Sequence, residues 1–124
     1  MSPLVLALTA SAITIAAWPL ASAWAGQPQF SVKESGRSFN TLQQAVDAVG
    51  DGQGTVLIAP GTYRECAVQQ GGDVSYEAIR PGTAIFEGVT CEGKAALVLR
   101  GRNANISGLV FRKMAVPDFN GAGI

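Results

Sequence analysis

The sequence predicts an all-β protein of the solenoid type, a parallel β-helix of about three coils with one α-helix covering its first end. Three observations support this prediction. Short β-prone stretches follow one another from Gly54 onward, two motifs recur at a nearly constant spacing, and one amphipathic helix pattern precedes them. A fixed period of this size is typical of solenoids, and the ends of a solenoid need a cap.

The first part of the chain predicts an export signal. Residues 3–25 form an apolar stretch, and the first 26 residues carry no charged side chain. Residues 1–25 are therefore predicted as a signal peptide cleaved after Ala23-Trp24-Ala25, with Ala21-Ser22-Ala23 as a second candidate. The alternative is an uncleaved membrane anchor, since about 20 apolar residues can span a bilayer. A cleaved signal would place the chain outside the cytoplasm, in the periplasm or secreted.

A single helix is predicted between the export signal and the strands. Residues 26–37 are polar, contain Pro and Gly, and are predicted as a linker or a short first strand. The helix is expected over residues 41–49, with Asn40 as N-cap and Gln43 as its capping-box partner. Gly50 suits the position after the helix. One apolar stripe follows the helical period and consists of Leu42, Ala45, Val46 and Val49.

Six short strands are predicted after the helix. Each is rich in β-branched or aromatic residues, and turn signals such as Pro60-Gly61 separate most of them. The predicted strands cover residues 55–59, 65–69, 74–79, 84–89, 96–99 and 105–111.

Two motifs recur along these strands. The segment Ile58-x-Pro60-Gly61-Thr62 returns at residues 79–83 after a shift of 21, and the segment from Ala84 to Cys91 returns at residues 104–111 after a shift of 20. This repeat predicts that Phe86 stacks on Ile106. The alternative interpretation is a small β-sandwich in which the repeat is a coincidence.

The run from Phe39 to Tyr63, FNTLQQAVDAVGDGQGTVLIAPGTY, resembles the N-terminal signature of right-handed parallel β-helix proteins, the pectate-lyase-like superfamily. Cys66, residues 91–94 and residues 116–124 are similar to exported bacterial β-helix repeat proteins without an assigned reaction. The resemblance covers about residues 38–124. It implies that these residues form the N-terminal cap and first coils of a truncated domain, which alone would be inactive.

The resemblance also implies a polysaccharide-processing parent protein. Lyases of this superfamily use clustered carboxylates to hold Ca²⁺, and calcium needs several oxygen ligands together. The acidic residues of this chain are scattered singly. No catalytic residue is therefore transferred, no metal site is predicted, and no cofactor is expected, although Ca²⁺ is conceivable for a longer parent.

Two cysteines, Cys66 and Cys91, are present. An exported chain with two cysteines favours one disulfide between them. Two buried free thiols are the alternative, because the repeat register aligns Cys66 with Phe86 or Glu87. A catalytic thiol is not expected, since the chain contains no His.

The charges are unevenly distributed, although nine basic and nine acidic residues give a net charge of zero. Residues 94–113 contain five basic residues and no acid. If Arg80 and Arg100 stacked, they would form a short cationic ladder with Arg102 nearby, which could bind the carboxylates of an acidic polysaccharide. The alternative is a solvated surface whose cations pair with Glu77 and Glu87.

Three function classes remain open. The first is a carbohydrate-binding or polysaccharide-processing protein, the second is a non-catalytic envelope scaffold or adhesion protein, and the third is a fragment without activity. Tyr63 and Tyr76 could stack on a sugar or pack in the core. A nucleic-acid partner is not expected, because the chain lacks a basic excess, and a membrane is expected only if the leader stays attached. The oligomeric state is open.

Overall fold

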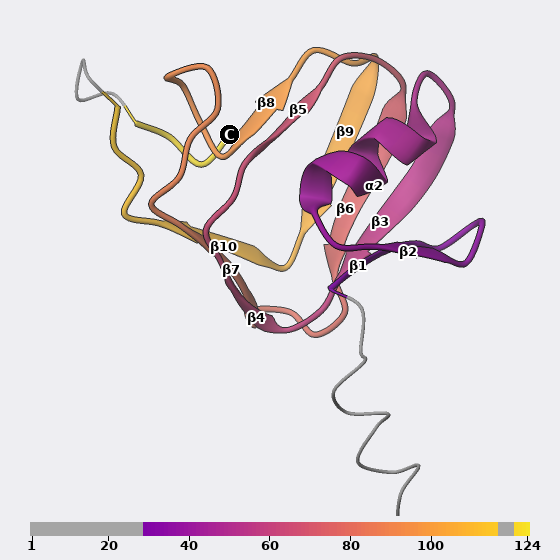
Figure 1. The fold of residues 1–124 in the computed structure, drawn as a ribbon, viewed down its shortest axis with the longest axis horizontal. Helices are drawn as coiled ribbons and strands as arrows, with labels where there is room; N and C mark the ends of the chain where they lie inside the picture. The colour runs from indigo at the N-terminus through magenta and orange to yellow at the C-terminus, as the bar shows by residue number, and fades with distance from the viewer. Residues whose placement is uncertain (1–28, 117–120) are drawn as a thin grey trace, which may run out of the picture.

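The computed structural model describes residues 29–116 and 121–124, so the predicted signal peptide lies outside the described residues. Within these described residues, ten strands and one helix follow one another (Figure 1). They are β1 (Phe30–Val32), β2 (Arg37–Phe39), α2 (Leu42–Val49), β3 (Gln53–Ile58), β4 (Gly61–Tyr63), β5 (Ala67–Gln69), β6 (Asp73–Ala78), β7 (Ala84–Glu87), β8 (Leu97–Leu99), β9 (Asn103–Ser107) and β10 (Leu109–Arg112).

The strands form three sheets. The largest sheet has the order β2-β1-β3-β6-β9, the second has the order β10-β7-β4, and the third pairs β5 with β8. Within the largest sheet, β1 runs antiparallel to both β2 and β3, whereas β3, β6 and β9 run parallel to one another. The large sheet is therefore mixed, and the two smaller sheets are parallel.

The parallel β-helix predicted from the sequence is wrong. That prediction required neighbouring strands that run parallel, whereas the structure has antiparallel pairs at β1 and three sheets of five, three and two strands. The described residues instead form a small β-rich domain with one short helix, without a solenoid or a closed coil.

The predicted repeat register is also wrong. Phe86 lies between Tyr63 and Phe111 in the second sheet, whereas Ile106 pairs with Tyr76 in the first. The physical reason is that the connections differ in length. β6 reaches β7 through five residues, whereas only Gly108 separates β9 from β10, so a constant shift cannot align both strand pairs.

The core lies where the three sheets and the helix face one another. Apolar side chains of the first two sheets and of α2 are fully buried there, and they include Phe30, Leu42, Ala45, Val56, Ile58, Val74, Tyr76, Ala84 and Phe86. The stripe predicted for the helix faces this core, with Leu42, Ala45 and Val46 buried and Val49 packed against its margin.

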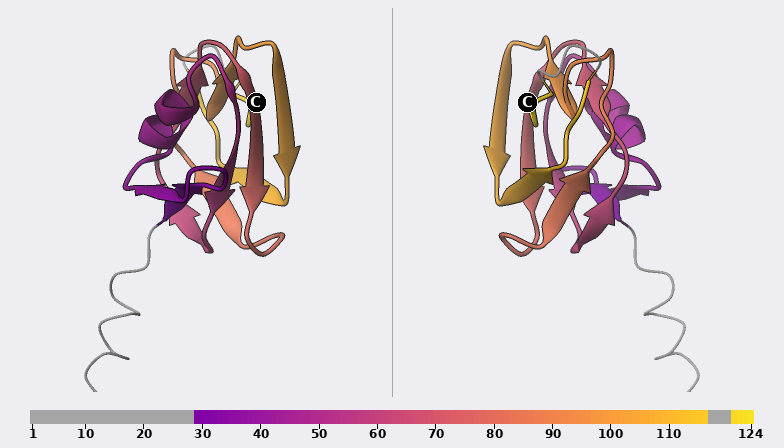
Figure 2. Two further views of the ribbon diagram at one scale, coloured as in Figure 1. Left: turned by 90° about the vertical axis from the view of Figure 1, so that its right-hand side faces the viewer. Right: turned by 90° about the vertical axis from the view of Figure 1, so that its left-hand side faces the viewer.

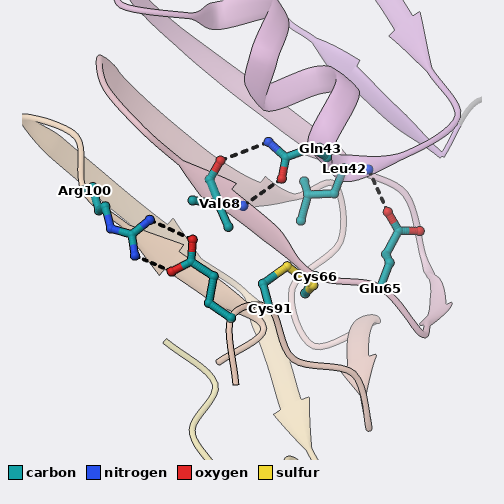
Figure 3. Close-up of a disulfide and its surroundings, with 8 residues drawn as sticks. Leu42, Gln43, Glu65, Cys66, Val68, Cys91 and Arg100 are labelled. Atoms are coloured by element: carbon teal, nitrogen blue, oxygen red, sulfur yellow. Dashed lines mark hydrogen bonds and ion pairs between the residues drawn. A yellow bond between two sulfur atoms is a disulfide. The ribbon is translucent and has the colours of Figure 1, made fainter. Parts of the chain in front are cut away.

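The helix begins one residue later than predicted. Thr41 is the N-cap, because its hydroxyl accepts the backbone N–H of Gln44 at 3.2 Å, and the Gln44 side chain accepts the N–H of Thr41 at 3.3 Å. Asn40 and Gln43 are therefore not the capping pair. Gln43 instead binds β5, since its side-chain amide accepts the Val68 N–H at 2.8 Å and donates to the Val68 carbonyl at 2.9 Å (Figure 3).

The predicted disulfide between Cys66 and Cys91 is confirmed. The two Cα atoms lie 5.5 Å apart, and the bridge closes a sequence separation of 25 residues. It joins the connection between β4 and β5 to the connection between β7 and β8. Figure 3 shows the bridge close to Glu65, whose carboxylate accepts the backbone N–H of Leu42 at 2.7 Å. The bridge, β5 and the start of α2 are therefore tied together.

One polar side chain, Gln69, is buried among these apolar residues and is only 1% exposed. Its amide nitrogen donates to the carbonyls of Gly71, Gly72 and Asn103 at 3.0–3.3 Å, and its oxygen accepts the hydroxyl of Tyr76 at 2.8 Å. A buried amide is tolerated only when it is hydrogen-bonded, and this one is fully satisfied.

Backbone corners pack closely around this amide. A Cβ on Gly72 would lie 2.3 Å from the carbonyl oxygen of Gly50, and one on Gly101 would lie 2.2 Å from the Gln69 amide nitrogen. Only glycine leaves room at these two positions. The corner is therefore a tightly specified polar joint between the sheets.

We predict that replacing Gln69 with Leu destabilises the domain by about 3 kcal/mol, because the Tyr76 hydroxyl and the corner carbonyls would lose their partner while buried. Urea unfolding followed by circular dichroism would measure the change. Gln70→Leu is the matched control, because Gln70 is exposed, and it should change the stability by less than about 0.5 kcal/mol. Equal effects of the two substitutions would contradict the role given to the Gln69 amide.

We also predict that the Cys66→Ser, Cys91→Ser double variant loses about 3 kcal/mol of unfolding free energy, the amount expected when a loop of this length is no longer closed. The same urea titration on the reduced wild-type protein should match the variant. A loss below about 1 kcal/mol in both would show that the bridge contributes little to stability.

Candidate functional site

The three arginines predicted to bind an anionic glycan, Arg80, Arg100 and Arg102, do not meet at one place. Arg80 follows the end of β6, whereas Arg100 precedes the start of β9. Because β6 and β9 pair in parallel, these two arginines lie beyond opposite ends of the strand pair. The expected ladder between Arg80 and Arg100 is therefore not formed.

Arg100 is held by an acidic residue. Both terminal nitrogens of its guanidinium donate to the carboxylate oxygens of Glu92 (Figure 3). Lys94 lies 4.0 Å from the same carboxylate. The hydrogen bonds from Arg100 lower the pKa of Glu92, and those to Glu92 raise the pKa of Arg100. We call Glu92, Lys94 and Arg100 the Glu92 cluster; its cations outnumber its carboxylate two to one.

Arg102 has a structural contact. Its guanidinium donates to the backbone carbonyl of Asp51 at 3.1 Å, and its backbone N–H donates to the carbonyl of Gly72 at 2.8 Å. It therefore connects the corner before β9 to the turn after α2, although its side chain is exposed.

A second cationic cluster was not predicted from the sequence. Arg112 donates from Nε to Glu87 at 2.8 Å, and Arg64 and Lys113 each lie 3.6 Å from the same carboxylate. The hydrogen bond from Arg112 is the main cause that lowers the pKa of Glu87. We call Arg64, Glu87, Arg112 and Lys113 the Glu87 cluster; three cations surround one carboxylate.

Strand pairing explains how the Glu87 cluster forms. Tyr63, Phe86 and Phe111 share one register position across β4, β7 and β10, and each is followed by a charged residue. Because side chains alternate between the two faces of a strand, the aromatic residues point to the core and the charged residues point outward. The recurring pair of an aromatic and a charged residue was the signal that could have identified this cluster.

The two clusters flank the disulfide. Cys66 lies two residues after Arg64, and Cys91 directly precedes Glu92. The covalent bridge therefore fixes the two connections from which part of each cluster projects.

The two tyrosines considered for sugar stacking are core residues. Tyr63 packs between Phe30 and Phe86, with ring centroids 5.0 and 5.3 Å away, and its hydroxyl donates to the Ala59 carbonyl. Tyr76 is fully buried, and burial raises the pKa of both hydroxyls. Neither ring is available to a ligand at the surface.

The side chains of the described residues determine which ligands, a metal ion or an anion, the domain could bind. Among residues 29–116 and 121–124, no three His, Cys, Asp or Glu side chains gather in a way that could hold a metal ion. Both cysteines are consumed by the disulfide. The exposed cations of the Glu87 and Glu92 clusters are groups that can bind anions.

The disulfide bears on the location of the protein. Disulfides persist in oxidising compartments, so the Cys66–Cys91 bridge is compatible with an extracytoplasmic location. The described part of the chain has no helix long and apolar enough to cross a membrane.

Comparison with known proteins adds no family to this picture. No protein-family model, curated protein or solved structure matches the chain, and so none identifies it with the pectate-lyase-like superfamily.

Proposed function

We propose that this chain is a non-catalytic binding protein of the periplasm or the cell exterior, and that it holds an acidic polysaccharide against its cationic clusters. The observation that carries the proposal is the surplus of exposed cations over carboxylates around Glu87 and Glu92.

The cations of the Glu87 cluster are more accessible than the carboxylate that they surround. The side chains of Arg64, Arg112 and Lys113 are 64%, 48% and 74% exposed, whereas that of Glu87 is 15% exposed. An incoming anion would therefore meet cations first. Glu87 acts as an internal counter-ion that holds the three cations together and cancels only part of their charge.

The spacing within this cluster suits a polymer with regularly placed carboxylates. Arg64 and Arg112 project from the ends of β4 and β10, which flank β7 on its two sides. Neighbouring strands lie about 4.8 Å apart, so the two backbone positions are about 10 Å apart. A guanidinium can bind a carboxylate through two parallel hydrogen bonds, which favours uronate groups as ligands.

Binding to polygalacturonate, measured by affinity electrophoresis and by calorimetry at low salt, tests the proposal. In the Arg64→Gln, Lys113→Asn double variant, the Glu87 cluster loses its net positive charge, while Arg112 still pairs with Glu87. Asn suits position 113 because the backbone there has a φ of 58°. We predict that affinity falls about tenfold, since each charge-assisted contact contributes about 1 kcal/mol or less at an exposed site.

The matched control carries the same two substitution types elsewhere. Lys33→Asn with Arg37→Gln removes two exposed cations from the segment of β1 and β2, and it should leave affinity within about twofold. Equal losses in the two double variants would show that only the total charge matters. Absence of binding by the wild-type protein at low ionic strength would refute the proposal, because exposed charges are least screened there.

The pKa directions predict how binding changes with pH. The pKa values of Glu87 and Glu92 lie below the ordinary value of 4.5, so both carboxylates stay charged until the pH falls below that value. Their protonation then removes two negative charges from the clusters. For dextran sulfate, whose sulfate groups remain ionised, we predict that affinity rises as the pH is lowered from 5 toward 3.

The Glu87→Gln, Glu92→Gln double variant should bind dextran sulfate more tightly at pH 5 and show a smaller increase than the wild-type protein as the pH is lowered, because the remaining acidic residues still gain protons. Circular dichroism at each pH would verify that the protein remains folded, because these ion pairs stabilise the fold only while the carboxylates are charged. A wild-type affinity that is constant or falls over this pH range would contradict the assignment of the two counter-ions.

A further inference from the structure

One end of the domain presents two open strand edges. β9 is the last strand of the five-stranded sheet, and β10 is the outermost strand of the three-stranded sheet beyond β7. Within the part of the chain that the structure describes, no strand pairs with the outer edge of either one. Only Gly108 separates the two strands, so the open edge follows residues 103–112. We call these residues the open edge.

Two edges at the helical end of the domain, those of β3 and β5, are covered by other elements, whereas the open edge is not. Figure 2 shows α2 and β9 on opposite sides of the molecule. At the helical side, the Gln43 amide satisfies both backbone groups of Val68 in β5, and β1 covers β3. At the open edge, β9 carries no proline and no charged residue, the features with which proteins usually protect edge strands.

The apolar side chains that extend the core to the open edge are only partly buried. Tyr76 and Phe86 are fully buried, but their outer neighbours, Ile106 and Phe111, are only partly buried. Leu99, Leu109 and Met114 are also partly buried at this end. An added strand would cover these apolar side chains.

The third sheet already shows how this end accepts an extended segment. The Leu97 N–H in β8 donates to the Gly123 carbonyl at 2.9 Å, and Ala122 forms a parallel bridge with Ala95. Gly123 also packs directly against Phe111. Residues 122–123 therefore cover β8, and no other described segment covers the outer edges of β9 and β10.

The charges indicate the chemistry of a further strand. Across β4, β7 and β10, one register position holds Arg64, Glu87 and Arg112, so the signs alternate. The next strand would place an acidic residue beside Arg112, because opposite charges are favourable directly across a strand pair. A second copy of this end would instead bring more cations, since residues 94–113 contain five and no acid.

We propose that the open edge binds an extended segment of a partner protein, which adds as a strand with alternating apolar residues and an acidic residue beside Arg112. Backbone hydrogen bonds to β9 and β10 would supply the general affinity, and the alternate side chains would supply the specificity. This partner is a different ligand from the polysaccharide proposed above, and its acidic residue would contact an arginine of the Glu87 cluster.

A synthetic peptide with the sequence of residues 73–88 is a suitable probe, because that sequence already pairs with β9 and β10 on their inner side. Hydrogen exchange on the wild-type protein should show new protection within residues 103–112 when the peptide is added. A scrambled peptide of the same composition is the control for charge alone and should bind at least about tenfold more weakly, because it lacks the alternation.

Charge reversal tests the register. Arg112→Glu should weaken binding of the peptide about fivefold, and a peptide carrying Glu87→Lys should restore it, since one cross-strand pair is reversed on both sides. Arg37→Glu is the control, because Arg37 lies in β2, and it should leave the affinity unchanged.

Four results would overturn the proposal. They are absence of binding, equal binding of the scrambled peptide, protection that requires self-association of the protein, and loss of protection in β3. The last would show that the peptide displaces the native strand β6 instead of adding outside β9.

Discussion

The satisfied burial of Gln69 is the constraint on which the arrangement of the sheets depends. Its amide joins the corner between β5 and β6 to the backbone of Asn103 at the start of β9, and it accepts the hydroxyl of Tyr76 from the core. Two sheets are thereby fixed relative to each other at one point. An apolar side chain could fill the same volume, but it could not satisfy three carbonyls that have left water.

This joint also determines where charge appears on the surface. The close corners hold β6 and β9 in register, and the pairing of β4, β7 and β10 then lines up the residues that follow the core aromatics. Glu87 consequently lies between Arg64 and Arg112. The cationic surface is thus a consequence of core register, and a change in core register would scatter these charges even if no charged residue were altered.

Some elements could be predicted from the sequence because their signals are local. The apolar stripe of α2 follows the helical period, and its burial is as expected. The N-cap was misplaced by one residue, since Asn40 and Thr41 are both good capping residues and each has a glutamine three positions later. The disulfide was predictable from the presence of two cysteines in a chain with an export signal.

The strand register could not be predicted in the same way. Similar short motifs recur after both 20 and 21 residues, but the shift that matters is set by how each connection crosses from one sheet to the next. The disulfide-bonded connection before β8 is long, and the one at Gly108 is a single residue. Arg80 and Arg100 were therefore matched in sequence although they lie at opposite ends of a strand pair. The Glu87 cluster was missed for the same reason, because it exists only in the true register.

The two surfaces of the domain differ in what they require from a ligand. The cationic clusters consist of exposed side chains, so their attraction to an anion is screened by salt and tolerates many arrangements of charge. The open edge presents backbone groups at fixed spacing beside partly covered core residues, so it selects for an extended polypeptide. Arg112 belongs to both, since it ends the charge row on β10 and also contacts Glu87. A partner strand whose acidic residue pairs with Arg112 would neutralise part of the cationic surface. Binding of that strand at the open edge should therefore weaken the binding of a polyanion to the Glu87 cluster.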